Sequence, residues 1–187
     1  MAFSSNGKIL LTSEYLVMDG AKSIAFPSKL SQELNVTNIK SESFFWKAYD
    51  HNNNLWFQEK FKIKQNKFLY DGKKNLVSER LNKLFNHLST KIGHKIFYGK
   101  EFKSKLNFNR NWGLGSSSTL VNNLAKWARV DPYEPLNSTF KGSGYDIACC
   151  DKTNPIIFTK KENMIEIVDI SFKVNFLDKI YLIYTNK

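Results

Sequence analysis

A loop of two glycines and three serines, running directly into an apolar segment, constrains this chain most. Residues 112–119 read Trp-Gly-Leu-Gly-Ser-Ser-Ser-Thr, and the apolar stretch 120–130 follows. Glycines let a backbone approach a ligand closely, and serines before a helix add hydroxyls and an N-cap where backbone N–H groups are unpaired. The pattern predicts a strand, a phosphate-binding loop and a helix in that order. A plain glycine turn before a serine-capped helix is the alternative that these residues leave open.

Two familiar phosphate-binding motifs are excluded. No Gly-Lys-Ser or Gly-Lys-Thr follows the glycines, as a Walker A loop requires. Ser118 occupies the position of the third glycine in a dinucleotide-binding fingerprint. As a phosphate site, the loop would therefore belong to another class.

Length and composition indicate one domain with a hydrophobic core. The chain has 187 residues, and no apolar run reaches the roughly 18 residues of a membrane span. Its N-terminus lacks the basic and apolar regions of a secretory signal. Adjacent Cys149 and Cys150 fit neither a mutual disulfide nor a metal-ligand spacing, so we expect buried, reduced thiols in a cytoplasmic protein.

The formal net charge of +11 favours anionic partners without identifying one. The lysines are spread thinly among aromatic, Asn and Gln residues, as in the segment 60–74. A solvated basic surface is the simplest interpretation; a polyanion site and an anionic small substrate stay open.

Hydrophobic periodicity predicts an α+β fold, a mixed β-sheet with packed helices. Turns are expected at Asp19-Gly20 and at a hairpin tip over 51–54. Helices are expected from Leu76 to near Gly93, over 117–128, and, as a short third helix, from about Tyr145. The expected strands cover 8–17, 33–39, 43–49, 55–64, 96–108, 155–158, 164–168 and 179–184.

Three segments read together resemble the motifs of the GHMP kinases, a superfamily that includes galactokinase, homoserine kinase, mevalonate kinase and phosphomevalonate kinase. The segments are 7–20 (Gly-Lys-Ile-Leu-Leu-Thr-Ser-Glu-Tyr-Leu-Val-Met-Asp-Gly), the glycine-serine loop, and 142–148 (Gly-Ser-Gly-Tyr-Asp-Ile-Ala). The third segment is similar to a bacterial group with a Gly-Tyr-Asp-Ile-Ala signature. The resemblance implies the ribosomal protein S5 domain 2-like fold of a GHMP kinase N-terminal lobe over residues 1–187.

The resemblance also implies catalytic roles. Asp146 matches the aspartate that takes the proton from the substrate hydroxyl, and Lys8 matches the lysine beside it. If so, their side chains should lie within about 4 to 6 Å. A helix cap for Asp146 and an ordinary surface position for Lys8 are the alternatives.

Binding roles follow from the same resemblance. Nucleotide phosphates are expected at Gly113, Leu114, Gly115, Ser116, Ser117 and Ser118, with Ser117 on the Mg²⁺ side. Ser143 and Gly144 are expected at the substrate, and Glu14 either there or in a structural ion pair.

The chain also departs from the family pattern. Pro135 stands where mevalonate kinases have a Mg²⁺-binding glutamate, with Glu134 adjacent, and Asn109 to Trp112 replace prolines before the glycines, with Arg110 a candidate phosphate contact. The glycine-rich motif of the family's C-terminal domain has no counterpart, so we expect an N-terminal half whose uncovered face promotes self-association.

The expected activity is ATP- and Mg²⁺-dependent phosphorylation of a small molecule, foremost mevalonate or phosphomevalonate in isoprenoid synthesis. A sugar or homoserine kinase stays open, because the residues that select the substrate cannot be located in the sequence. A basic nucleic-acid-binding module of S5-like fold is the non-catalytic alternative. It is disfavoured because a nucleic-acid binder has no use for the loop together with Lys8 and Asp146.

Overall fold

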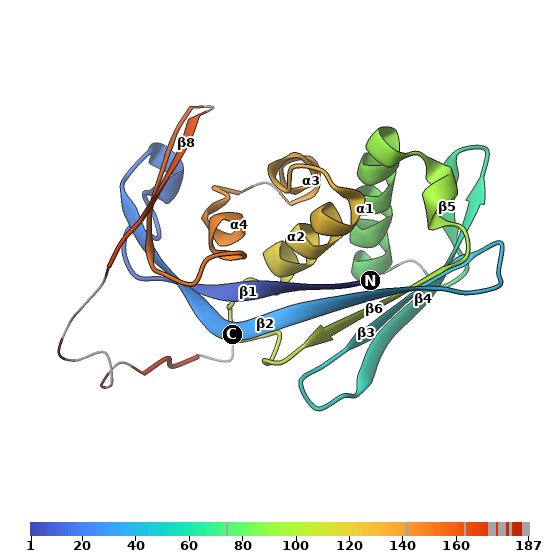
Figure 1. Cartoon of the computed structure of the whole chain (residues 1–187), viewed down its shortest axis with the longest axis horizontal. Coiled ribbons are helices and arrows are strands. Elements are labelled where there is room, and N and C mark those ends of the chain that lie inside the picture. Colours follow the sequence, from blue (N-terminus) through green and yellow to red (C-terminus); the bar gives the residue numbers. More distant parts are fainter. Residues whose placement is uncertain are drawn as a thin grey trace.

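A mixed β-sheet carries all the α-helices on one face (Figure 1). The computed structural model describes residues 1–73, 75–140, 142–162, 164–171, 175, 179 and 181–184. Over these residues the predicted α+β class is confirmed. No helix in the described part of the chain is both long and apolar enough to cross a bilayer.

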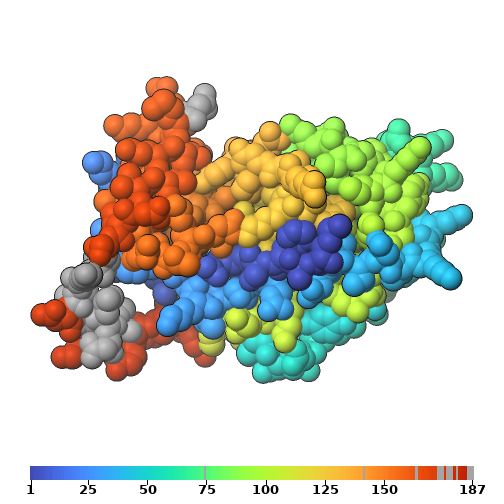
Figure 2. Space-filling view, in the orientation of Figure 1, coloured from blue at the N-terminus to red at the C-terminus, as the bar shows by residue number. Residues whose placement is uncertain are grey.

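The long strand β2 organises the sheet. The strand order is β5-β4-β3-β6-β2-β7-β8, and β1 pairs with β2 outside this path. Only the β3–β6 pair is parallel among the pairs described; the others are antiparallel. Figure 2 shows β1, in dark blue, at the surface between the helices and β2. The strands are β1 Ala2–Leu10, β2 Ser23–Asn38, β3 Phe44–Tyr49, β4 Leu55–Lys64, β5 Lys67–Tyr70, β6 Lys100–Leu106, β7 Ile156–Lys161 and β8 Met164–Asp169.

Local sequence signals explain the main helix, α1. The Asn75 side chain accepts a hydrogen bond from the backbone N–H of Ser78 at 2.9 Å, which satisfies one free donor of the first turn. Gly93 ends the helix at φ 77°. The other helices are α2 Ser116–Ala128, α3 Tyr133–Thr139 and α4 Tyr145–Cys149, with short 3-10 turns η1 Val17–Asp19 and η2 His94–Phe97; α1 covers Leu76–Ile92.

An aromatic cluster joins the sheet to α1 and α2. Phe44 stacks on Phe61 of the neighbouring strand, with ring centroids 5.0 Å apart, and meets Phe85 of α1 edge-on at 5.2 Å. Phe102 of β6 meets Trp127 of α2 edge-on at 4.9 Å. Edge-to-face and offset pairs add to the free energy gained from burial alone. The cluster therefore fixes α2, and with it the loop before α2, against the sheet.

Several predicted boundaries were wrong. The first strand ends at Leu10 instead of continuing to residue 17, because Ser13 has φ 65° and the chain enters η1. The expected strand over 96–108 begins only at Lys100, after η2. The expected strand over 179–184 lies partly outside the described residues, and residues 181–184 are not in a strand.

One β-strand and one α-helix were missed altogether. β5 follows a two-residue turn in which Gln65 and Asn66 both have positive φ, without the glycine that usually marks such a hairpin. α3 contains Pro135 in its first turn, where a missing N–H costs nothing because those donors are unpaired in any helix.

Candidate active site

The loop before α2 has the backbone that its glycines predict. Gly113 and Gly115 have φ 73° and 85°, a region that side chains disfavour. Leu114 between them is buried with Leu106 and Phe108. The buried leucine anchors the loop, so its two glycines can turn at the surface.

The prediction that a serine caps the N-terminus of α2 was wrong. Helix α2 begins at Ser116, its N-cap is Gly115, and no side chain caps it. Ser116 and Ser117 are half-buried, Ser118 is buried, and Thr119 donates a hydrogen bond to Gln32 Oε1 at 2.7 Å. The helix start therefore keeps two accessible hydroxyls and the positive end of its dipole for a ligand.

Lys8 and Asp146 meet beside this loop. Lys8 Nζ lies 3.1 Å from Asp146 Oδ1, and their side chains are 14% and 25% exposed. The same ammonium donates to the Gly113 carbonyl at 3.1 Å and lies 5.1 Å from the Tyr145 ring centroid. The expected proximity of the two side chains is confirmed. Their catalytic roles stay a prediction.

A bulge in β1 aims Lys8 at the loop. The β1–β2 register shifts between Asn6 and Lys8, so Gly7 lies at the irregularity. A Cβ on Gly7 would be 2.8 Å from the Leu114 carbonyl oxygen, which accepts a hydrogen bond from Lys8 N at 3.0 Å. Only glycine allows this approach. The loop and β1 are thus joined at the residue before the lysine.

The ion pair keeps a cation in a half-buried position. Burial lowers the pKa of Lys8, but the charge of Asp146, together with hydrogen bonding to Tyr145 and Asp146, outweighs it, and the net pKa lies above its ordinary value. Burial also raises the pKa of Tyr145, with a smaller contribution from the Asp146 charge. Lys8 is therefore charged, and Tyr145 neutral, at every physiological pH.

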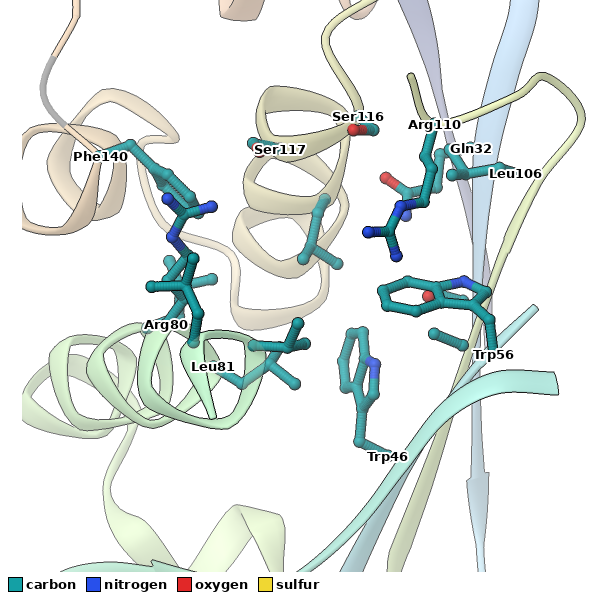
Figure 3. A pocket seen from close by; sticks show the side chains of 16 residues that line it. Gln32, Trp46, Trp56, Arg80, Leu81, Leu106, Arg110, Ser116, Ser117 and Phe140 are labelled. Atoms are coloured by element: carbon teal, nitrogen blue, oxygen red, sulfur yellow. The ribbon is translucent and has the colours of Figure 1, made fainter. Parts of the chain in front are cut away.

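A cavity of about 290 Å³ opens on the other side of the serines, between α1, α2 and the sheet (Figure 3). Its volume is at the lower end of small-molecule pockets, about 300 to 1,000 Å³. Arg80 and Arg110 lie on opposite sides of it in Figure 3. Sequence reasoning singled out Arg110, Ser116 and Ser117, but no local pattern indicated Trp56 or Arg80. The lining includes Trp46, Trp56, Arg80, Leu81, Arg110, Ser116, Ser117 and Phe140.

Comparison with solved structures shows which proteins share this architecture. Lactococcus lactis galactokinase, complexed with galactose, matches with a TM-score of 0.66 and 16% identity over 92% of this chain and 47% of its own. Staphylococcus aureus mevalonate kinase matches with a TM-score of 0.57 and 18% identity, over 89% of this chain and 54% of its own. Streptococcus pneumoniae phosphomevalonate kinase, complexed with phosphomevalonate and AMPPNP, matches with a TM-score of 0.56 and 13% identity, over 85% of this chain and 49% of its own. The fold is that of the N-terminal lobe of GHMP kinases.

The likeness is one of fold, since the identities are low. The chain spans about half the length of these kinases. Its sequence matches no protein-family model and no curated protein.

The other site residues predicted from the sequence have less support in this fold. Glu14 is exposed and forms no ion pair within the described part of the chain. Ser143 is buried and accepts a 3.5 Å hydrogen bond from Tyr145 N. Gly144 is the N-cap of α4 at φ 92°. Substrate contacts at these three residues stay predictions.

The carboxylate considered for Mg²⁺ lies elsewhere. Glu134 pairs with Lys91 Nζ of α1 at 2.7 Å, and Pro135 beside it is buried. Within the described residues no cluster of three or more His, Cys, Asp or Glu side chains could hold a metal by itself. Mg²⁺ needs few protein ligands, since it commonly binds one or two oxygen donors plus substrate phosphates and water. The Ser117 hydroxyl fits that pattern.

Proposed function

We propose that this chain is the nucleotide-binding lobe of an ATP-dependent kinase that phosphorylates a hydroxyl or phosphate of a small molecule. One observation carries the proposal: the Lys8–Asp146 pair lies against Gly115, whose next two residues line the cavity. A Cβ on Gly115 would be 3.2 Å from Asp146 Oδ1 and 3.4 Å from Lys8 Cε. A nucleotide in the cavity can thus reach the ion pair across the loop.

In the proposed arrangement the cavity takes the nucleoside and the start of α2 takes the phosphates. Backbone N–H groups of the first turn and the Ser116 and Ser117 hydroxyls face the anion. Mg²⁺, when bound, neutralises phosphate charge, and Ser117 is the residue that would hold it. Gly113 and Gly115 keep the loop free of side chains where the phosphates approach.

The reaction needs a base and a cation, and the pair supplies both. With a hydroxyl acceptor, Asp146 takes the proton as the acceptor oxygen bonds to the γ-phosphorus. The bond from that phosphorus to the bridging oxygen breaks, and ADP leaves. Lys8 attracts the charge on the transferring phosphoryl group while it holds Asp146 in place.

Mevalonate and phosphomevalonate are the foremost acceptors, because the Gly-Tyr-Asp-Ile-Ala segment and Ser13-Glu14-Tyr15 resemble kinases of those compounds. Structural neighbours that include a galactokinase keep a sugar acceptor in consideration.

An ATP-consumption screen of the full-length gene product tests the proposal. The acceptors are mevalonate, phosphomevalonate, homoserine and galactose. We expect ADP release with one of them, and a loss of about two to four decades in Asp146→Asn. Asp71→Asn removes an equivalent carboxylate from an exposed pair with Lys62 and should leave the rate unchanged. A protein that binds no ATP would contradict the proposal.

A further inference from the structure

The β3–β4 hairpin lies over the segment that enters the phosphate loop. The Arg110 guanidinium carbon is 4.5 Å from the Trp56 ring centroid, and the His51 ring is 6.4 Å from that of Trp112. Asp50 fixes the hairpin tip, since its Oδ1 accepts hydrogen bonds from the backbone N–H groups of Asn52 and Asn54 at 2.9 and 2.8 Å. A rigid hairpin therefore holds Arg110 in one orientation just before the glycines.

The stacked arginine keeps its hydrogen-bonding edge free. A guanidinium that stacks by its face on an aromatic ring leaves its N–H donors in the plane, directed outward. Arg110 lines the cavity together with Ser116 and Ser117, and Figure 3 shows its guanidinium directed into that space. Within the described residues Arg110 forms no ion pair, so this cation has no protein carboxylate to neutralise it.

We infer that Arg110 is a phosphate-contacting residue that Trp56 holds in position. The inference rests on the proposed function. It identifies the polyphosphate of the nucleotide, and not its nucleobase, as the partner of Arg110. Its support is the neighbouring helix start, where free N–H groups and two hydroxyls already favour an anion. Arginine presents paired donors that match two phosphate oxygens, and stacking on Trp56 reduces the entropy lost on binding.

Arg80 offers an internal comparison. It lies on α1 at the opposite side of the same cavity, with its guanidinium carbon 5.5 Å from the Phe140 ring centroid. It carries the same charge on a similar aromatic support but is not joined to the loop. If the net charge of the cavity were sufficient, the two arginines would be equivalent for an anion. We expect them to differ.

Calorimetry of the full-length protein with ATP, inorganic tripolyphosphate and adenosine tests the inference. Arg110→Gln should weaken ATP and tripolyphosphate binding about tenfold to a hundredfold, the range for losing hydrogen bonds to a charged group. Adenosine affinity should change less than about twofold, because it carries no phosphate. Trp56→Leu keeps the charge but removes the stacking partner, and should cause a smaller loss for both anions.

Two controls separate the outcomes. Arg129→Gln removes an exposed arginine at the far end of α2 and should leave all three affinities unchanged, while Arg80→Gln should weaken tripolyphosphate less than Arg110→Gln does. Equal losses from Arg80 and Arg110, or a loss confined to adenosine, would overturn the inference. Wild-type protein that binds tripolyphosphate through Arg110 but no ATP would overturn only the proposed kinase function. Protein that binds neither overturns both.

Discussion

Lys8 and Asp146 should act as a unit, because one ammonium joins the Asp146 carboxylate and the Gly113 carbonyl. We expect Lys8→Met and Asp146→Asn each to lower turnover and the double variant to lose less than the product of the two effects, as residues in direct contact do. Steady-state kinetics on the acceptor found in the screen measures this.

The exposed pair Lys62–Asp71, with Nζ and Oδ2 3.0 Å apart, provides a control double-mutant cycle. Its side chains are 52% and 51% exposed, so its coupling in unfolding experiments should be about 0 to 1 kcal/mol. The coupling of the less exposed Lys8–Asp146 pair should be larger. Equal coupling in the two cycles would show that the pair by the loop is merely a surface contact.

Cys149 makes stability depend on alkaline pH. Burial, and then the Asp146 charge, raises the pKa of its thiol from an ordinary value of 9.0 to about 12. The unfolded chain loses this proton first, so the stabilisation is complete below pH 9 and is lost as the pH rises from about 9 to 12. Buried Cys150 has a raised pKa as well and acts in the same direction.

We therefore expect a melting temperature that is flat from pH 7.5 to about 8.5 and falls above it, with a smaller fall in Cys149→Ala. Both thiols should resist a thiol reagent at pH 8 until the protein unfolds, since only the thiolate reacts. A rise in melting temperature through this range, or rapid labelling of native protein, would contradict the assignment.

At the scale of elements, the glycine-serine loop depends on Gly113 and Gly115 for different reasons. Both have left-handed φ, so an alanine at either should cost about 1 to 2 kcal/mol of folding free energy. A Cβ on Gly113 meets nothing within 4 Å, whereas one on Gly115 crowds Asp146 and Lys8. Chemical unfolding of Gly113→Ala and Gly115→Ala should give similar losses of stability.

Their effects on activity should differ. Gly115→Ala pushes against the ion pair and should lower turnover well beyond the change in Gly113→Ala. The two variants share backbone strain, so the difference isolates contact with Lys8 and Asp146. Equal turnover in the two variants would show that the position of the Lys8–Asp146 pair next to Gly115 does not matter for the reaction.

For the whole molecule, several of the most exposed apolar side chains lie at the end opposite β5. Tyr15 and Leu16 near η1 are 92% and 57% exposed, and Met164 of β8 is 77% exposed. The β7–β8 hairpin projects at that end (Figures 1 and 2), where a Cβ on Gly20 would be 3.2 Å from the Lys160 carbonyl oxygen. Large exposed apolar side chains on neighbouring elements can form part of an interface.

We expect concentration-dependent association in sedimentation velocity. The combined change Tyr15→Ser and Leu16→Ser should weaken it, whereas Leu69→Ser, which removes a 47% exposed leucine from β5, should not. A single monomeric species at all concentrations, or equal effects of both variants, would contradict an interface at this end.

The accuracy of the sequence predictions follows the range of the forces involved. The helix from Leu76 to Ile92 was predicted closely because its cap and its apolar spacing are local. The strand expected over 179–184 was wrong in the residues described, because an apolar run becomes a strand only if a partner pairs with it. β5 was missed for the converse reason: four residues with little pattern pair with β4 across a tight turn.

By itself the sequence determined the loop, its torsional demands and the residues able to carry charge or accept a proton. The conformations of Gly113, Gly115 and the helix after them depend on neighbours a few residues away, so the local sequence determines them. Tertiary structure decided that Lys8 reaches Asp146, which only the family resemblance had predicted, and that Trp56 supports Arg110, since these pairs join separate strands, helices and loops. Such contacts depend on strand register and on close packing of the whole core, and no local pattern encodes either.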